Sequence, residues 1–259
     1  FSPPIPDMFG FGRTVHTAVG KLHELFPTEA PTQDQARQVS DQVFHLKHVP
    51  QARDPINHPG PYERARDAAR EIVEQYVRDF SADFVRSRQV EARFEIPAQD
   101  CLITGAIDLL LREDAAGAIV GAEVVDFKAI EGGDDPLQNV DLEWTDLALQ
   151  VQLYARAATR VLGQNAATGS VHLLKDGQRV VVPIDAAAIA AAVANVEWAV
   201  RGILNGEFPA RPHQRKCGDC DFRAICPKVP GQFNSQPPPE LHLPNGQRRK
   251  VLAHSEFTP

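Results

Sequence analysis

Two short segments carry the residue types that a metal-dependent cleavage of phosphodiester bonds needs. They are Gly105-Ala106-Ile107-Asp108 and, further along the chain, Val125-Asp126-Phe127-Lys128. Each ends an apolar run that is typical of a buried β-strand. Two carboxylates can hold a hard divalent cation, and a lysine beside them steadies the attacking water and the charge that builds on the phosphate.

The spacing inside these segments supports this interpretation. Side chains alternate along a strand, so Asp126 and Lys128 point to one face and Phe127 to the other. If the two strands pair, Asp108 and Asp126 can share one Mg²⁺ or Mn²⁺, and the Phe127 backbone carbonyl offers another oxygen. Gly105 marks a close approach of backbone or ligand. Either aspartate alone fits a strand-end charge facing solvent, but both together with the lysine favour a metal site, because a buried unpaired charge is costly.

The composition sets wider limits. A chain of 259 residues with 24% charged residues can bury a full core, as one α/β domain with extra helices or small appendages. The sequence has no run approaching about 18 apolar residues and no visible signal peptide, so we expect no membrane partner. The net charge of −7 does not indicate a general nucleic-acid-binding protein, although a nuclease can use acidic residues for its metal and keep basic residues local.

Basic residues and cysteines gather in separate places. The arginines between Arg64 and Arg88 form a first group, which a solvated helix face explains at least as well as a nucleic-acid surface does. Three cysteines form C-x2-C-x5-C, which in a chain without a secretory signal favours a metal site and a reducing cytoplasm. These residues are Arg64, Arg66, Arg70, Arg78, Arg86 and Arg88; then Arg211, Arg215 and Lys216; and the cysteine trio Cys217, Cys220 and Cys226.

Periodic patterns predict the elements that must position these residues. Apolar residues at helical spacing predict helices over 12–26, 32–47, 62–87, 143–163 and 185–205. Alternating patterns predict strands over 90–97, 102–112, 118–128, 170–174 and 179–183, the last two forming a hairpin around Asp176-Gly177.

The order of these elements predicts an α/β fold with a central mixed β-sheet flanked by helices, rather than a doubly wound nucleotide-binding fold. Residues 131–141 are rich in Gly and Asp, and we expect a mobile loop there. The chain has no Gly-rich phosphate loop, so it is not expected to be an ATPase.

The succession GxxD, a turn and (D/E)xK resembles the PD-(D/E)XK nuclease superfamily, and more narrowly its RecB-like branch of helicase–nucleases and CRISPR-associated exonucleases. Gly12-Arg13-Thr14-Val15-His16 resembles the GxxxH helix of that branch, and with Phe11 and the Pro-rich loop it most resembles nuclease domains fused to UvrD-type helicases. Gln150-Val151-Gln152-Leu153-Tyr154 resembles the QxxxY motif. The cysteine trio resembles three ligands of an iron–sulfur cluster that pins the ends of the domain together.

The resemblance implies a role for each matching residue. His16, Asp108 and Asp126 would bind Mg²⁺ or Mn²⁺ together with the Phe127 carbonyl, and the imidazole would favour Mn²⁺. Lys128 would orient or activate water. Gln150 and Tyr154 would position the strand, and Glu91 would touch the metal or its waters. Cys217, Cys220 and Cys226 would hold a 4Fe–4S cluster, with zinc as the alternative.

The resemblance also implies an organisation and an activity. The expected organisation is an N-terminal helical region over 1–61, a restriction-endonuclease-like core over 62–210, a cysteine segment over 211–228 and a Pro-rich tail over 229–259. The expected activity is that of an Mg²⁺- or Mn²⁺-dependent deoxyribonuclease in the cytoplasm, an exonuclease acting on single strands or duplex ends with a helicase in repair, recombination or defence. A catalytically inactive DNA-binding or scaffolding module of a helicase complex is the alternative.

Two positions depart from the family pattern. Ile107 replaces the proline of the superfamily's name, which leaves the carboxylate in place. The fourth cluster cysteine is missing, and we expect it in a segment upstream of Phe1; Cys101 is better explained as a small core residue. Three thiolates without a fourth ligand suit neither zinc nor a stable cluster well.

Overall fold

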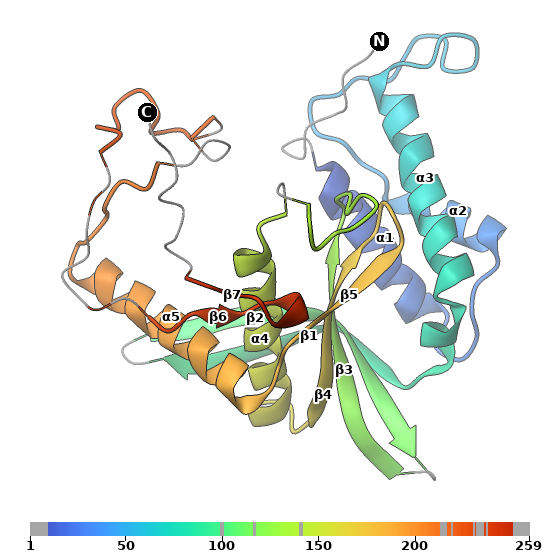
Figure 1. Ribbon diagram of the computed structural model, residues 1–259. Coiled ribbons are helices and arrows are strands. Elements are labelled where there is room, and N and C mark those ends of the chain that lie inside the picture. The colour runs from blue at the N-terminus through green and yellow to red at the C-terminus, as the bar shows by residue number, and fades with distance from the viewer. Residues whose placement is uncertain are drawn as a thin grey trace.

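The computed structural model describes residues 10–98, 101–115, 118–139, 142–212, 217–218, 220–229, 231, 236 and 238–250. Its centre is a five-stranded sheet with the order β1-β2-β3-β4-β5. The strands are β1 (Arg88–Ala98), β2 (Cys101–Ala115), β3 (Ala118–Lys128), β4 (Ala166–Leu173) and β5 (Gln178–Val182). Helices cover the sheet on both sides (Figure 1).

The sheet is mixed, as the sequence predicts. β2 pairs antiparallel with both β1 and β3, β4 pairs antiparallel with β5, and β3 and β4 are parallel. A parallel pair needs a crossover, which α4 (Trp144–Arg160) supplies. The prediction of an α/β fold with a mixed sheet between helices is therefore confirmed. The predicted boundaries between domains stay predictions.

Three helices precede the sheet: α1 (Phe11–Leu25), α2 (Gln33–Val43) and α3 (Pro61–Asp79). Thr32 begins α2 with a capping box, in which its hydroxyl accepts from the Gln35 amide and the Gln35 side chain accepts from the Thr32 amide. The predicted second and third helices were too long. The chain leaves α2 at Phe44 in extended conformation, and after α3 it makes a 3₁₀ turn, η2 (Ser81–Val85), which buries Phe84.

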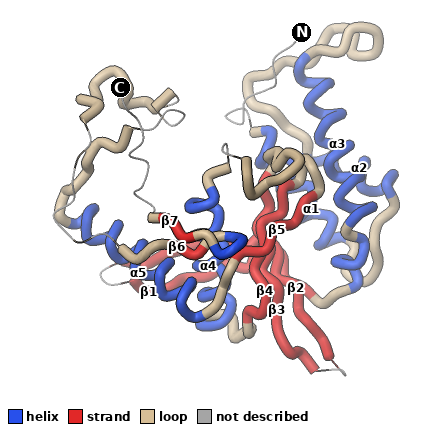
Figure 2. The backbone as a smooth tube through the Cα atoms, in the orientation of Figure 1, coloured by secondary structure: helices blue, strands red, loops and turns tan. Residues whose placement is uncertain are grey.

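One layer of the core lies between these helices and the sheet (Figure 2). The apolar stripe of α1 packs against residues of β2 and β3 that alternate along each strand. Burial therefore fixes how α1 is rotated on the sheet. The principal residues are Val15, Val19, Leu22, Leu109, Leu111, Val125 and Phe127.

The other face of the sheet is covered by α4 and by α5 (Ala186–Leu204), whose first turn is capped by the Asp185 side chain. By length and mean hydropathy, 1.4 over an 18-residue window, α5 is long and apolar enough to cross a membrane. Its high hydropathy comes from alanine together with Ile, Val and Leu, and a stripe including Ala191, Asn195 and Trp198 is buried where α5 packs on α4 and β6. This pattern is that of a packing helix with one buried face.

Part of the Pro-rich C-terminal region packs on the domain. β6 (Leu241–His242) and β7 (Arg248–Arg249) form a short antiparallel hairpin, and the segment that connects them contains a 3₁₀ turn, η3 (Pro244–Gly246). Leu241 and Leu243 are buried beside α4, and Gln152 Nε2 donates to the His242 carbonyl over 2.7 Å. Residues 238–250 thus wrap the domain.

The loop after β3 is fastened rather than free over residues 131–139. The Asp176 carboxylate accepts hydrogen bonds from the Gly132 and Gly133 amides, the second over 2.9 Å. Gln178 Nε2 donates to the Gly133 carbonyl over 2.8 Å. A Cβ at Gly132 would lie 2.6 Å from Leu173 Cδ1 and 2.8 Å from Pro136 Cγ, so a larger residue here would force these side chains to shift. The expectation of a mobile loop over 131–141 came from composition and stays a prediction; these contacts with the β4–β5 turn hold Gly132 and Gly133, and residues 140 and 141 lie outside the described residues.

Candidate metal centre

The two predicted aspartates lie side by side at one end of the β2–β3 ladder. Leu109 pairs with Val125, so Asp108 and Asp126 are the next residues on the two adjacent strands. Beyond that pair, the Phe127 amide donates to Asp108 Oδ2 over 2.7 Å. This bond orients one carboxylate and joins the strands where both carboxylates stand.

Helix α1 brings His16 to this pair. His16 Nε2 lies 3.0 Å from Asp108 Oδ2, and His16 Nδ1 lies 3.4 Å from Glu91 Oε1. A ligand atom from each of these three residues lies within 4.8 Å of the others. The His16 side chain is 28% exposed and that of Glu91 is 50% exposed, so the group opens to solvent on the Glu91 side.

Glu91 has an unusual backbone. Its φ is 50°, in the left-handed region, although it lies within β1. The ladder passes from the Val90–Leu109 pair to the Ala92–Ile107 pair and omits Glu91 opposite Asp108. A non-glycine residue in this region costs about 1–3 kcal/mol. The strain falls on the residue whose carboxylate faces His16.

Asp126 is fully buried, with an exposed fraction of 0%, and it faces Lys128. Lys128 Nζ lies 3.0 Å from Oδ1 with hydrogen-bond geometry and 2.7 Å from Oδ2 without it. Among the residues that the structure describes, Asp126 Oδ2 therefore has a cation beside it but no hydrogen-bond donor. The shorter distance to Oδ2 does not make a hydrogen bond, because a hydrogen bond needs a suitable angle as well as a short distance.

A chain of hydrogen bonds leads from the lysine into α4. Lys128 Nζ donates to Gln150 Oε1 over 2.9 Å, and Gln150 Nε2 donates to Tyr154 Oη over 2.6 Å. Tyr154 is nearly buried, and its ring packs edge-on against Phe94 of β1. The structure thus joins the two residues of the QxxxY pattern to the lysine, rather than leaving them as separate surface groups.

Burial and neighbouring charges shift two of these groups. Burial raises the pKa of Asp126 to about 7, and the Asp108 charge adds to the rise, against the effect of Lys128 and His16. Burial alone would lower the pKa of His16, but the hydrogen bond to Asp108 and the charges of Asp108, Glu91 and Asp126 raise it above its ordinary value. The protein therefore has an excess of negative charge here, which a bound cation would offset.

The donor set fits a divalent cation. Carboxylates from Glu91, Asp108 and Asp126 with one imidazole suit Mn²⁺ or Mg²⁺ better than soft metals. The buried Oδ2 of Asp126, which lacks a hydrogen-bond donor, is the kind of atom that a metal ion satisfies. The group within 4.8 Å of one another consists of His16, Glu91 and Asp108 and does not include Asp126. The Phe127 carbonyl and the individual ligand roles stay predictions.

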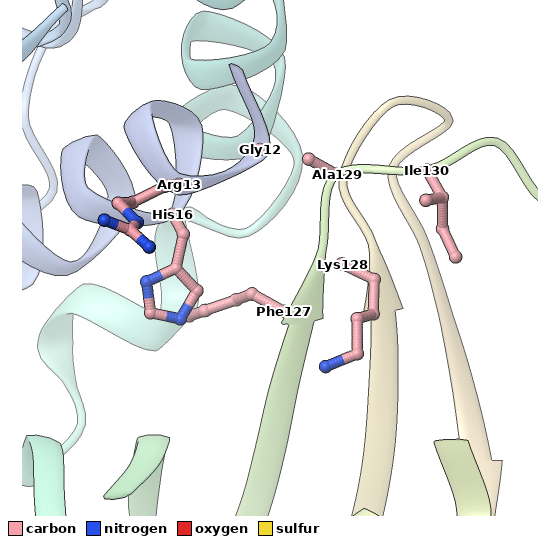
Figure 3. Close-up of a pocket in the computed structure, with 7 residues that line it drawn as sticks. All are labelled: Gly12, Arg13, His16, Phe127, Lys128, Ala129 and Ile130. Atoms are coloured by element: carbon pink, nitrogen blue, oxygen red, sulfur yellow. The ribbon is translucent and has the colours of Figure 1, made fainter. Parts of the chain in front are cut away.

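A hollow of about 320 Å³ opens beside this centre (Figure 3). Its walls are the first turn of α1 on one side and the end of β3 with the following loop on the other. Arg13 lines it together with His16 and Lys128. Sequence reasoning did not include Arg13 in the site, although it lies three residues before His16 and thus on the same helix face.

Three of the four arginines of α3 lie beside acids, and the fourth, Arg64, donates to the Pro59 carbonyl over 2.7 Å. Arg70 makes ion pairs with Asp41 and Asp67, whereas Arg66 and Arg78 lie beside the adjacent acids Asp67 and Asp79. These contacts favour the interpretation of a solvated, charge-balanced face.

The two arginines that follow α3 also have structural partners. Arg86 pairs with Glu123 over 2.8 Å. The Arg88 guanidinium donates to backbone carbonyls, including those of His23 and Phe26 at the end of α1. Arg88 thereby fastens the helix that carries His16 to the start of β1.

The cysteine trio is not gathered into a metal site in the part of the chain that the structure describes. Cys220 is exposed, and Cys217 and Cys226 are half-buried. The segment lies beyond the end of α5, on the opposite side of the molecule from α1 (Figure 1). Cys101 is half-buried at the start of β2, where its thiol faces the Ala98 carbonyl, so the prediction of a core position was wrong. The iron–sulfur cluster stays a prediction.

Comparisons with known proteins were made for sequence and fold. The family model of the PD-(D/E)XK nuclease superfamily matches residues 4–227. No curated protein matches the sequence. Among solved structures, SSO0001 is similar with a TM-score of 0.39 and 15% identity, covering 83% of this chain and 85% of its own. A protein described as a "putative exonuclease" from Eubacterium rectale is similar with a TM-score of 0.48 and 15% identity, covering 91% of this chain and 79% of its own.

Proposed function

This chain belongs to the PD-(D/E)XK nuclease superfamily, and on that premise we propose that it is an Mg²⁺- or Mn²⁺-dependent deoxyribonuclease. One observation carries the proposal. His16, Glu91 and Asp108 converge beside a buried Asp126 whose Oδ2 lacks a hydrogen-bond donor, and Lys128 stands next to it. Such a set has the ligands and the cation that hydrolysis of a phosphodiester requires.

In this proposal, the four metal-binding residues contact the cation in two ways, directly or through its waters. His16, Asp108 and Asp126 would hold the cation, and Glu91, which is exposed, would reach its outer waters. A bound divalent cation polarises the scissile phosphate and makes water a better nucleophile at neutral pH. The Phe127 amide keeps the Asp108 carboxylate turned toward His16, since it donates to the oxygen that His16 approaches.

Lys128 acts on the water or the phosphate. An ammonium group has three donors, and two of them go to Asp126 and Gln150. The third remains to orient a water molecule or to meet a phosphate oxygen as negative charge builds on it. Gln150 and Tyr154 determine where that donor points.

The proposal also covers the mode of cleavage, the branch of the superfamily, the partner and the cellular setting. We infer exonuclease action on single strands or duplex ends, membership of the RecB-like branch, a helicase partner and a cytoplasmic setting. They rest on the GxxxH and QxxxY patterns and the cysteine spacing. The alternative is an inactive DNA-binding or scaffolding module. The retained ligand set favours the enzyme, because a scaffold does not require a histidine, three carboxylates and a lysine at one point.

The decisive experiment compares wild type with Asp126→Asn and Lys128→Met on end-labelled single- and double-stranded DNA, with Mg²⁺ and with Mn²⁺. Asp126→Asn keeps the size of the side chain and removes its charge, so the fold should persist. We expect both variants to cut at least about a hundredfold more slowly. Arg160→Gln, an exposed change at the last residue of α4, is the control and should cut like wild type.

Two other measurements complete the test. Mn²⁺ should raise the melting temperature of wild type more than that of Asp126→Asn, because a ligand that binds the native state stabilises it. Undiminished cleavage by both variants would sink the proposed mechanism. A wild type that binds DNA and cuts nothing with either metal would favour the scaffold. For the cysteines, iron and sulfide analysis after anaerobic purification would distinguish a cluster from zinc.

A further inference from the structure

Arg13 occupies a position that the proposed chemistry does not use. It lies in the first turn of α1, one helical turn before His16, and its side chain is exposed at the hollow beside the metal centre (Figure 3). Within the described part of the chain it makes no ion pair and no side-chain hydrogen bond. The other cation of α1, Lys21, pairs with Glu24 over 2.8 Å.

Among the described residues, the walls of the hollow that Arg13 lines contain no carboxylate. The other walls of the hollow are Gly12, Phe127, Ala129 and Ile130, which have no charge, and His16 and Lys128, which face carboxylates of the metal centre. An arginine fork is suited to phosphate and carboxylate oxygens. The hollow therefore offers a cation to an anionic group that enters from solvent.

The first turn of α1 adds to this preference. Its N-cap residue is Gly10, which has no side chain to accept from the N–H groups of the first turn. Gly12 brings the backbone of that turn to the wall of the hollow without a side chain in between. Unpaired N–H groups and the helix dipole favour an anion. The helix end alone would not define a site, and the exposed arginine that lines the hollow without an ion-pair partner among the described residues is what singles it out.

We propose that the hollow is a phosphate subsite, in which Arg13 binds a phosphate of the DNA strand next to the one being cut. The inference rests on the proposed nuclease function and adds a contact that determines where the strand lies. The phosphate is either an internal phosphodiester or a terminal phosphate group. Binding of an internal phosphate suits cutting within a strand. Binding of a terminal phosphate would fix the number of nucleotides between the strand end and the cut.

The test measures DNA binding by fluorescence anisotropy, with Ca²⁺ in place of Mg²⁺ to suppress cleavage, over a series of NaCl concentrations. The chains are wild type, Arg13→Gln, Arg13→Lys and the control Arg160→Gln. The probes are one single-stranded oligonucleotide with hydroxyl ends, the same strand with a 5′- or a 3′-phosphate, and strands with a single neutral methylphosphonate at successive positions.

We expect Arg13→Gln to bind several-fold more weakly and to lower the slope of log Kd against log salt by about 0.7, the value for one phosphate contact on a single strand. Arg13→Lys should restore most of the slope, and Arg160→Gln should match wild type. Loss of the Arg13 effect when one internal phosphate is neutral identifies an internal phosphate. An effect of Arg13→Gln that is seen only with a phosphorylated end identifies a terminal phosphate.

The failures can be told apart. A wild type that cuts DNA, with an Arg13→Gln slope equal to wild type on every probe, overturns the subsite and leaves the nuclease intact. A wild type that neither binds nor cuts overturns both proposals. Because Arg13 is exposed, the melting temperature of Arg13→Gln should equal that of wild type, so a change in slope cannot come from unfolding.

Discussion

Lys128 Nζ donates to Gln150 Oε1 over 2.9 Å, so a helix that follows the metal centre in sequence fixes the direction of its lysine. Gln150 is held in turn by its own contact with Tyr154 Oη over 2.6 Å. Tyr154 acts on Lys128 only through Gln150, so substitution of Tyr154 should lower activity less than substitution of Gln150.

We therefore predict graded losses of activity. Gln150→Ala removes a hydrogen bond to a charged group and should lower kcat about tenfold, whereas Tyr154→Phe removes a neutral bond and should lower it about fivefold. Both effects should appear in kcat rather than KM if the pair positions Lys128. A larger effect on KM, or a larger effect of Tyr154→Phe, would show instead that the pair touches the strand directly.

The left-handed backbone of Glu91 gives a prediction about stability. In an ordinary strand, glycine is less stable than alanine by about 0.5–1 kcal/mol. At Glu91 the order should reverse, because a Cβ is unfavourable at this φ by about 1–2 kcal/mol. Urea unfolding of Glu91→Gly and Glu91→Ala measures this. Glu95, exposed on the same strand without a positive φ, is the control and should show the ordinary order.

Acid should weaken the fold through the buried histidines. Burial lowers the pKa of His172 to about 3, with Arg179 adding to the effect. Between the unfolded value of 6.5 and about 3, only the unfolded chain takes up the proton, so stability falls as pH falls. Between pH 6.5 and 5 this term should remove about 2 kcal/mol.

The variant His172→Phe isolates that term. His172 packs among the rings of Tyr76, Phe80 and Phe127, and phenylalanine has a similar flat shape without a titrating group. Urea unfolding at both pH values should show that wild type loses about 2 kcal/mol more than the variant on acidification. An equal loss in the two proteins would mean that His172 titrates alike in the folded and unfolded states. His23, whose pKa burial also lowers to about 3, acts in the same direction in both proteins.

The loop after β3 should be released by one substitution. Asp176→Ala removes the acceptor of the Gly132 and Gly133 amides and should cost about 1–3 kcal/mol. Limited proteolysis should then cut within 131–139 faster than in wild type. Asp134→Ala, an exposed change in the same loop, is the control. Equal cutting of all three proteins would show that other contacts hold the loop.

The sequence predicted those parts of the site that depend on local order. Alternation alone placed Asp126 and Lys128 on one face, and strand ends placed Asp108 near Asp126. His16 and Gln150 entered only through family motifs, because nothing local shows which helix returns to a strand.

Other features could not be predicted from local patterns. The bond from the Phe127 amide to Asp108 and the strained φ of Glu91 depend on how β1, β2 and β3 meet. The same reason explains why β4 begins at Ala166, earlier than predicted: its start is set by parallel pairing with Ala122 of β3.

The site takes its residues from five elements, which in chain order are α1, β1, β2, β3 and α4. No single helix or strand holds the donors, the lysine and the glutamine that orients it. The histidine precedes the other site residues in the chain, so the site is complete only when β1, β2, β3 and α4 have packed against α1. The metal centre can therefore form only after all of these elements have packed together.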